Sequence, residues 1–203
     1  MPAARESLLD AAYTALARRP WSAVRMVDVA AAAGVSRQTL YNEFGGKDGL
    51  ARALVRREAD GYLAGVERAL SSAVDARERL TATAEWITLA ARQNALVGAM
   101  VTGCWSERLP RPSLAAVPSS AAVPAQRRAD GPLPSPGDLV ALVRDRAVAV
   151  LGGGRARPGT ETAELARACE LAVRLALSCV AAPPGEGGVA GLIRDALSRQ
   201  TTG

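Results

Sequence analysis

The chain has 203 residues, of which 49% are hydrophobic, and its formal net charge is +5. This hydrophobic content is enough for a folded core, and the abundance of alanine with only short β-branched runs favours packed helices over sheets. Because the sequence contains no histidine, Ser-His-Asp hydrolysis, HExxH metalloprotease chemistry and histidine-ligated metal sites are excluded.

The cysteines and the hydropathy pattern indicate the compartment. Cys104, Cys169 and Cys179 show no CxxC spacing, and an odd number fits no closed disulfide framework, so we interpret them as small apolar residues in a reducing compartment. The first ten residues carry three charges and lack the apolar segment of a signal peptide. No stretch reaches the roughly 18 uncharged apolar residues of a membrane span. We therefore expect a cytoplasmic protein without a membrane contact, a metal or another cofactor.

The N-terminal part of the chain predicts four helices. Apolar residues recur at helical spacing over about residues 3–18, and a proline ends that pattern. Trp21 is then expected to fill the space between helices. Two short helices are expected over residues 27–33 and 36–44, and a long one over residues 47–70.

The later part of the chain predicts further helices and one long loop. A helix begins near residue 75, and residues 92–104 either continue it with a kink or form a separate short helix. A run rich in proline, serine and alanine excludes a continuous helix, so we expect a loop over about residues 106–136 that covers one end of the bundle. Helices are then expected over residues 138–151, after Thr160 as an N-cap, and at the C-terminal end. The predicted fold class is all-α.

Residues 27–50 carry the pattern of two short helices that cross at a steep angle. Ala30 is small enough for the crossing, and Gly34 can take the left-handed conformation that the turn requires. Val35 is expected to pack under the turn, and Ser36 to cap the second helix. These features together predict a helix-turn-helix.

The second of these helices has one apolar and one polar face. Leu40 and Phe44 lie four residues apart and are expected to be buried. The remaining side chains are hydrogen-bonding groups suited to base edges and phosphates, and they are Arg37, Gln38, Thr39, Tyr41 and Asn42.

Lys47 is the only lysine among the 25 basic residues of the chain. It stands at the predicted start of the long helix, where a compact ammonium is well placed to hold a backbone phosphate. Chance is the alternative, since one lysine must stand somewhere. The net charge permits nucleic-acid binding but is spread along the chain, so the motif must carry that inference.

This segment closely resembles the signature of the TetR family of transcription regulators, in which an I-A pair is followed by A-G-V-S, T-L-Y and F-x-x-K-x-x-L. The matching positions are Val29, Ala30, Ala33, Gly34, Val35, Ser36, Thr39, Leu40, Tyr41, Phe44, Lys47 and Leu50. The strong resemblance covers about residues 5–60. It implies a helix-turn-helix domain over residues 1–50, a helical ligand-binding and dimerisation domain over residues 51–203, and a homodimer that binds a palindromic operator in double-stranded DNA.

The resemblance also implies roles for single residues. Arg37 and Gln38 are expected to read bases, since arginine pairs with guanine and glutamine with adenine. Thr39, Tyr41 and Lys47 are expected to contact phosphates and fix the register, and Asn42 could contact either a base or a phosphate. The whole predicted DNA-binding set is Ser36, Arg37, Gln38, Thr39, Tyr41, Asn42 and Lys47. The alternatives are packing at the core edge for Tyr41, simple solvation for Arg37 and a local backbone hydrogen bond for Thr39.

Two positions depart from the family pattern. Glu43 replaces the usual Tyr or His, and a carboxylate near phosphates is unfavourable. It must therefore point away, accept from a base amino group, or pair with a neighbouring arginine. The threonine that usually caps the first helix of the motif is absent near Val24 and Arg25, so that cap is missing or rebuilt.

The regulatory half is specified less sharply. By resemblance, the middle helices hold a ligand pocket, and the last two helices form a four-helix bundle with the partner subunit. The stripe that fits this use in the last helix comprises Val189, Leu192, Ile193, Ala196 and Leu197, and burial within the subunit is the alternative. The small residues Ala168, Ala172 and Ala176 would allow close helix approach.

The candidate pocket residues are mostly apolar, with few polar groups among them. They are Trp86, Gln93, Asn94, Met100, Cys104, Trp105, Arg144 and Val148, and each could instead be ordinary core. Such a lining suits a small hydrophobic effector, such as an alkane, a fatty acid or a lipid-like molecule. Residues 39–60 are also similar to regulators of actinobacterial alkane oxidation. We therefore expect a repressor that its ligand releases from DNA.

The sequence leaves two other classes of protein to consider, an enzyme and a scaffold or activator. The glycine-rich loop at residues 152–155 has neither the preceding strand nor the following Lys-Ser/Thr of a phosphate-binding loop, and no nucleophile stands beside a base, so we do not expect an enzyme. The remaining alternative is a scaffold or an activator that retains the helix-turn-helix fold.

Overall fold

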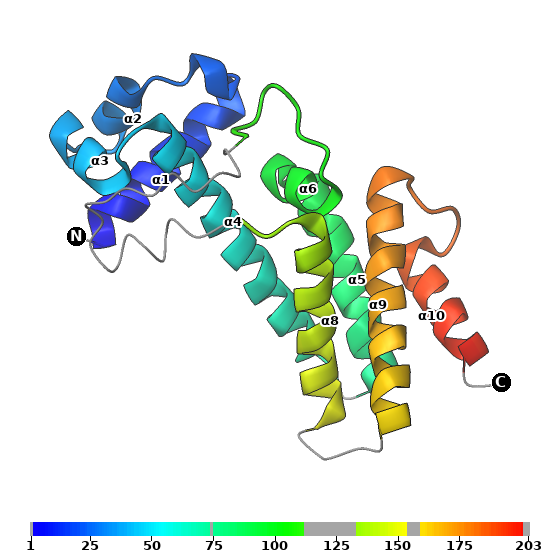
Figure 1. The fold of residues 1–203 in the computed structure, drawn as a ribbon. Coiled ribbons are helices and arrows are strands. Elements are labelled where there is room, and N and C mark those ends of the chain that lie inside the picture. Colours follow the sequence, from blue (N-terminus) through cyan, green and yellow to red (C-terminus); the bar gives the residue numbers. More distant parts are fainter. Residues whose placement is uncertain (1, 74, 112–132, 154–158, 201–203) are drawn as a thin grey trace. The chain divides into compact units, whose positions relative to one another are not determined.

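The computed structural model describes residues 2–73, 75–111, 133–153 and 159–200, and these residues form helices without a strand (Figure 1). The chain divides into two units, the first comprising residues 1–59 with 105–133 and the second residues 60–104 with 134–203. The division falls inside a long helix, whereas the boundary expected from the sequence, after residue 50, lies near the start of that helix.

The first unit is a cluster of short helices. Its elements are α1 (Pro2–Arg18), a 3-10 turn η1 (Trp21–Ala23), α2 (Met26–Ala32), α3 (Arg37–Phe44) and the first part of α4 (Lys47–Leu70). α1 packs against α2 and α3, and α2 packs against α3. The fully buried side chains at its centre include Leu8, Leu9, Val29, Leu40, Leu50 and Leu54. The expected helices are therefore present, and burying their apolar faces holds them together.

Trp21 links this cluster to a later part of the chain. Its side chain is 8% exposed, and its backbone N–H donates to the carbonyl of Arg108 at 2.8 Å. The space-filling role expected for this residue agrees with its burial. The contact also attaches residues 105–111 to the first unit.

The second unit is a helical bundle. Its further elements are α5 (Ala76–Gln93), α6 (Ala95–Thr102), α8 (Pro136–Gly152), α9 (Gly159–Ala181) and α10 (Gly188–Gln200). α9 lies between α8 and α10 in Figure 1 and packs against both of them and against α5. Its core is built from fully buried Leu70, Ile87, Leu96, Leu139 and Ile193.

The break between α5 and α6 settles one alternative left open by the sequence. Asn94 has an extended backbone, with φ −126° and ψ 109°, and its side-chain oxygen accepts from the N–H groups of Leu96 and Val97. An asparagine in this position ends one helix and caps the next. Residues 95–102 therefore form a separate short helix.

The start of α8 is fixed by a reciprocal cap. The Ser135 hydroxyl accepts from the N–H of Asp138 at 3.1 Å, and the Asp138 carboxylate accepts from the N–H of Ser135 at 2.9 Å. Pro136 occupies the first helical turn, where its missing N–H costs nothing. The helix thus begins two residues before the expected start at residue 138. Most of the loop expected over residues 106–136 lies outside the described residues.

The start of α9 differs from the expectation. The helix begins at Gly159, so Thr160 lies in its first turn and is not the N-cap. The sequence pattern of threonine followed by acidic residues indicated the right region but not the terminal residue. Helix ends commonly shift by one or two residues in this way.

Small residues on α9 bring its backbone close to α5. Ala172 and Ala176 are buried, and the Thr88 hydroxyl donates to Ala84 O at 2.9 Å and to Ala176 O at 3.4 Å. Arg92 also donates to Cys179 O, near the end of α9, at 3.1 Å. The close approach expected of these alanines thus occurs at least partly within one subunit. It supports the α5–α9 contact.

The cysteines differ in environment. Cys169 and Cys179 are buried, and burial raises the pKa of the Cys169 thiol to about 11. A protonated buried thiol behaves as a small hydrophobe, as the sequence indicated. Cys104 is exposed, so the same interpretation does not describe it.

Candidate nucleic-acid interface

The turn between α2 and α3 has the conformation that the sequence predicts. Gly34 has a φ of +67°, in the left-handed region that a side chain disfavours. The N–H of Val35 donates to Ala30 O at 3.0 Å, and Ala30 is 1% exposed. The small alanine and the left-handed glycine together set the direction in which α3 leaves the turn.

The first turn of α3 is closed by two hydroxyl side chains. Ser36 accepts from the N–H of Thr39 at 3.0 Å, and the two hydroxyl oxygens lie 2.9 Å apart. Ser36 is therefore the N-cap of α3. Thr39 takes part in the local hydrogen bonding that was the alternative to a phosphate contact.

The two faces of α3 separate as the sequence predicts. Leu40 and Phe44 are buried, whereas the side chains on the other face include exposed Arg37, Gln38, Tyr41 and Asn42. Tyr41 is 42% exposed, which argues against packing at the core edge. The Gln38 amide donates to the Asn42 carbonyl oxygen at 2.7 Å, so these two side chains are aligned along one face of the helix. This face is polar and open.

Lys47 stands at the first residue of α4, close to η1. Its Nζ donates to Ser22 O at 3.0 Å and lies 5.6 Å from the centre of the Trp21 ring. Burial lowers the pKa of Lys47, and the charge of Asp48 partly offsets this effect. An ammonium has three donors, so the bond to Ser22 leaves two for another acceptor.

Glu43 pairs with an arginine, which is one of the three arrangements expected for it from the sequence. Its Oε1 accepts from Arg5 Nη1 at 2.7 Å, and the Arg5 guanidinium also lies 4.9 Å from the centre of the Phe44 ring. Both charged side chains are largely shielded from solvent. The departure from the family pattern in α3 is thus matched by an arginine in α1.

The cap of α2 is missing rather than rebuilt. Arg25 occupies the N-cap position with an extended backbone, and its side chain makes no capping hydrogen bond. Asp28 lies in the first turn of α2, where an acid is favourable, and it pairs with Arg19 at 3.1 Å.

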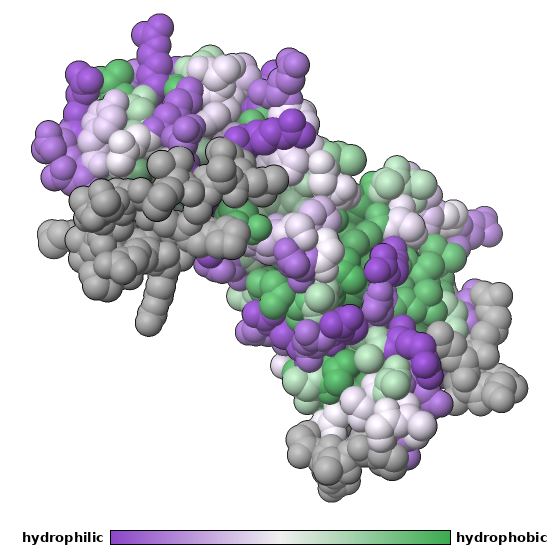
Figure 2. All heavy atoms as spheres, in the orientation of Figure 1, coloured by the Kyte–Doolittle hydropathy of each residue, from purple (hydrophilic) through white to green (hydrophobic). Residues whose placement is uncertain are grey.

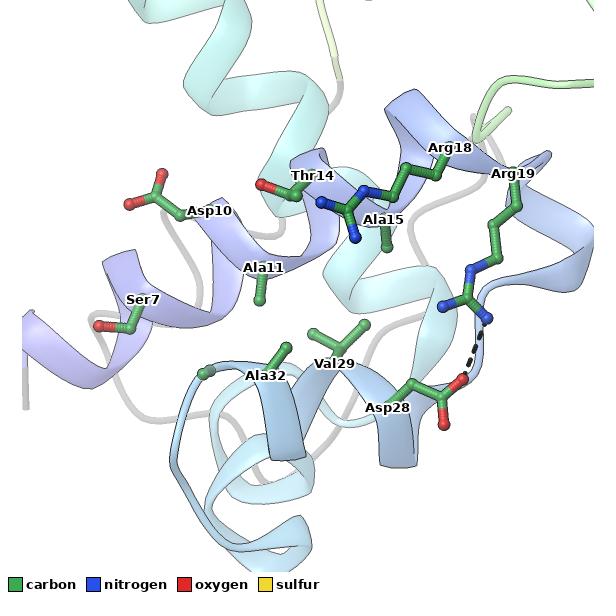
Figure 3. A pocket seen from close by; sticks show the side chains of 11 residues that line it. Ser7, Asp10, Ala11, Thr14, Ala15, Arg18, Arg19, Asp28, Val29 and Ala32 are labelled. Atoms are coloured by element: carbon green, nitrogen blue, oxygen red, sulfur yellow. Dashed lines mark hydrogen bonds and ion pairs between the residues drawn. The ribbon is translucent and has the colours of Figure 1, made fainter.

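A groove of about 470 Å³ runs between α1 and α2 (Figure 3). Its floor is made of small side chains, with Ala11 and Ala15 of α1 directed towards Val29 and Ala32 of α2. The groove lies within the first unit and includes none of the residues expected to bind a ligand.

The residues expected to bind a ligand mostly have structural contacts in the second unit. Trp86 Nε1 donates to Tyr62 O at 3.1 Å, and Asn94 caps α6. Arg144 pairs with Asp145 at 2.8 Å, and it lies 3.5 Å from Glu170 on α9.

The other candidates differ in burial. Met100 is buried in α6 and Val148 is half-buried in α8, whereas Gln93 and Cys104 are exposed. Trp105 belongs to the first unit. Their role in ligand binding remains a prediction. Among the described residues, no group of histidine, cysteine, aspartate or glutamate side chains is arranged to hold a metal ion. No helix there is both long and apolar enough to span a membrane.

Sequence reasoning missed three residues that shape these units. Arg5 reaches α3 from a helix far away in the sequence, so only the fold reveals the contact. Gly49 lies where a Cβ would overlap the Phe44 carbonyl oxygen. Tyr62 is a buried phenol in α4, and burial strongly raises its pKa. An aromatic residue in the helical pattern was the signal available for Tyr62.

Comparison with known proteins shows which family the N-terminal region resembles. Residues 8–54 match the model of the bacterial regulatory proteins of the tetR family. The HTH-type transcriptional regulator AlkX of Mycobacterium tuberculosis is 49% identical over 70 residues, which cover 34% of this chain and 33% of that protein. The HTH-type transcriptional activator FasR of Mycolicibacterium smegmatis is 38% identical over 81 residues, which cover 40% and 37% of the two chains. The chain thus matches about a third of the length of these curated relatives.

A solved structure extends the likeness in fold to the second unit. The TetR family repressor AlkX of a Dietzia species, implicated in biodegradation of n-alkanes, superimposes with a TM-score of 0.51 over 97% of this chain and 95% of that one, at 21% identity. At this identity the likeness concerns the fold alone. The close sequence match includes the helix-turn-helix described above. Residues 8–54 of the chain thus match the DNA-binding region of the tetR family of bacterial regulatory proteins.

Proposed function

We propose that this protein is a sequence-specific DNA-binding repressor that binds a palindromic operator as a homodimer and leaves it when a hydrophobic ligand binds. The observation that carries the proposal is the polar, exposed face of α3, which is held outward by the turn at Gly34 and by burial of Leu40 and Phe44. A helix of this kind fits the major groove of DNA.

The residues of that face support direct reading of bases. Arg37 stands exposed at the first position of α3, and its guanidinium suits the two acceptors of guanine. Gln38 and Asn42 present amides that suit adenine. Tyr41 and Lys47 supply a hydroxyl and an ammonium for phosphates, which fix the register of the helix on the duplex.

The apolar surface of the second unit supports self-association. Figure 2 shows hydrophobic side chains gathered on the face that carries α8 to α10, whereas hydrophilic side chains dominate the N-terminal helices. Leu192 of α10 is 43% exposed, while Val189, Ile193 and Leu197 of the same stripe are buried within the subunit. We therefore assign Leu192 and half-buried Leu175 of α9 to the subunit interface.

The proposed effector is an alkane, a fatty acid or a lipid-like molecule. The helices expected to surround it bury mainly apolar side chains, among them Ile87, Leu96, Met100 and Val143. AlkX of the Dietzia species is described as implicated in n-alkane biodegradation. A ligand can release DNA only by favouring a conformer whose two reading helices no longer match grooves about 34–36 Å apart.

The DNA-binding proposal is tested with the full chain and DNA from upstream of its own coding sequence. Fluorescence anisotropy measures the affinity, and a selection from random duplexes gives the preferred sequence. Wild type should bind a palindrome, and Arg37→Ala should lose discrimination at one base position in each half-site. Arg167→Ala is the matched control, because Arg167 is an exposed arginine on α9. Absence of binding to any duplex at low salt would overturn the proposal.

The dimer and ligand parts have separate tests. Leu192→Glu should produce monomers in sedimentation, whereas Leu89→Glu, at an exposed apolar position on α5, should leave the dimer intact. Hexadecane or palmitic acid should weaken operator binding by wild type. A Leu192→Glu variant that remains dimeric would reject the proposed subunit interface. An operator affinity that neither hexadecane nor palmitic acid changes would reject the proposed effector class.

The direction of regulation has a second candidate. FasR, a relative over 81 residues, is described as an activator, which favours activation as the alternative to repression. A reporter gene behind the operator distinguishes the two. Its expression should rise when the regulator is deleted, and a fall would assign the chain as an activator.

A further inference from the structure

We propose that Arg5 is a positioning residue for the DNA-reading helix, and that it allows α3 to carry the acid Glu43 beside residues that contact phosphates. The inference rests on the proposed DNA-binding function and goes beyond it, because it assigns a role to a residue outside the helix-turn-helix. It concerns a pair in which an unusual acid and its partner come from helices far apart in the sequence.

The contact geometry supports this role. Arg5 Nη1 lies 2.7 Å from Glu43 Oε1, and the guanidinium carbon lies 4.9 Å from the centre of the Phe44 ring. The two charged side chains are 28% and 30% exposed, so solvent screens them less than a fully exposed pair. A guanidinium can bind a carboxylate through its edge and a ring through its face, which an ammonium cannot do equally well.

The position of the contact along α3 explains why it matters. α3 has eight residues, and a helix of that length is not stable alone in water. Ser36 holds its first turn, and buried Leu40 and Phe44 attach its inner face. Arg5 contacts the last turn of α3 through Glu43 and the Phe44 ring. The reading helix is therefore fixed at both ends.

The charge of Glu43 gives the second part of the role. Glu43 follows Asn42 directly in α3 and stands four residues before Lys47, the first residue of α4, so it is close in sequence to residues that we assign to the DNA surface. An unpaired carboxylate there repels the DNA backbone, and pairing with Arg5 cancels that charge. Arg5 thus acts on DNA through Glu43 and α3, without a contact of its own to a phosphate.

The test compares wild type with Arg5→Ala, Glu43→Gln and the double variant. Operator affinity is measured at several salt concentrations, and melting temperature is followed in parallel. Arg5→Ala should weaken binding about tenfold, Glu43→Gln should stay within about threefold of wild type, and the double variant should regain most of the loss. Rescue of affinity by Glu43→Gln at unchanged melting temperature is the decisive readout, because a pair that served stability alone would restore affinity and melting temperature together.

Three results would overturn the inference. One is a double variant as weak as Arg5→Ala with a salt slope lower by about one, which would mean that Arg5 binds a phosphate directly. Another is an Arg5→Ala variant that binds as wild type does. If Arg5→Ala fails to fold, Arg5→Gln takes its place and is tested with and without Glu43→Gln. The third contradicting result is then that Glu43→Gln does not restore the operator affinity of Arg5→Gln. A wild-type chain that binds no DNA would overturn the proposed function itself, whereas these three results leave that function standing.

Discussion

The indole of Trp86 occupies the space in which a side chain at residue 65 would begin. A Cβ built on Gly65 would overlap the indole ring. The same ring donates from Nε1 to Tyr62 O at 3.1 Å, and the Arg68 guanidinium lies 5.7 Å from its centre. The second part of α4 is thus attached to α5 at a notch that only glycine provides.

Gly65→Ala should therefore destabilise the second unit. The added methyl group must displace the indole and break its hydrogen bond, and overpacking of this kind costs about 1–3 kcal/mol of unfolding free energy. Chemical denaturation followed by tryptophan fluorescence measures the change. Gly61→Ala is the matched control on the same helix, since no atom lies near a Cβ there, and alanine should stabilise the helix by up to about 1 kcal/mol. Equal changes in unfolding free energy for Gly65→Ala and Gly61→Ala would contradict the close packing of Trp86 against Gly65.

Gly49→Ala should disturb the junction between α3 and α4. A Cβ at this position would overlap the backbone oxygen of Phe44, and a backbone atom cannot move without moving the end of α3. We expect a loss of about 1–3 kcal/mol in stability together with weaker operator binding. Gly46→Ala provides the comparison, because the space around residue 46 is open. Operator affinity that is the same for both variants would show that the reading helix tolerates the shift.

Lys47→Ala should weaken binding to all DNA sequences alike. The ammonium is held by Ser22 O and the Trp21 ring, and its remaining donors are free to contact a phosphate. Loss of one phosphate contact flattens the slope of affinity against salt by about one. Lys47→Arg keeps the charge and should keep most of the slope. A slope in Lys47→Ala identical to that of wild type would assign the lysine to anchoring η1 alone.

Features set by neighbouring residues could be predicted from the sequence, whereas contacts between distant helices could not. Local patterns predicted the helix-turn-helix, because the conformation at Gly34 and the cap at Ser36 are decided by neighbouring residues. The pairing of Arg5 with Glu43 joins helices that only the tertiary fold brings together, so the sequence allowed three arrangements for that acid. Asn94 is a different case, because its cap of α6 is a local interaction, yet the sequence around it was compatible with a kinked helix as well as with a separate short one.

The ligand-binding residues were the least predictable part. Apolar side chains at helical spacing indicate that a face is buried but not whether it lines a cavity or fills the core. Trp86 and Arg144 appeared as candidate ligand contacts, and in the structure they bind Tyr62 O and Glu170. The alanines of α9 were similarly ambiguous, since a small residue permits close approach to any neighbouring helix.

The cap of α8 makes the stability of the second unit depend on pH. Hydrogen bonds from the Ser135 backbone and hydroxyl lower the pKa of the Asp138 carboxyl below its usual value of 3.8. Since the folded chain holds this proton less tightly than the unfolded chain, the cap contributes stability that is present above about pH 4 and is lost as pH falls through the lowered folded-state pKa. Thermal melting of wild type and Asp138→Asn should therefore differ most near neutral pH and converge in acid. Glu85→Gln, which removes an exposed acid on α5, controls for the change in net charge. A difference between wild type and Asp138→Asn that stays constant down to about pH 2 would mean that the ionised carboxylate does not stabilise the cap.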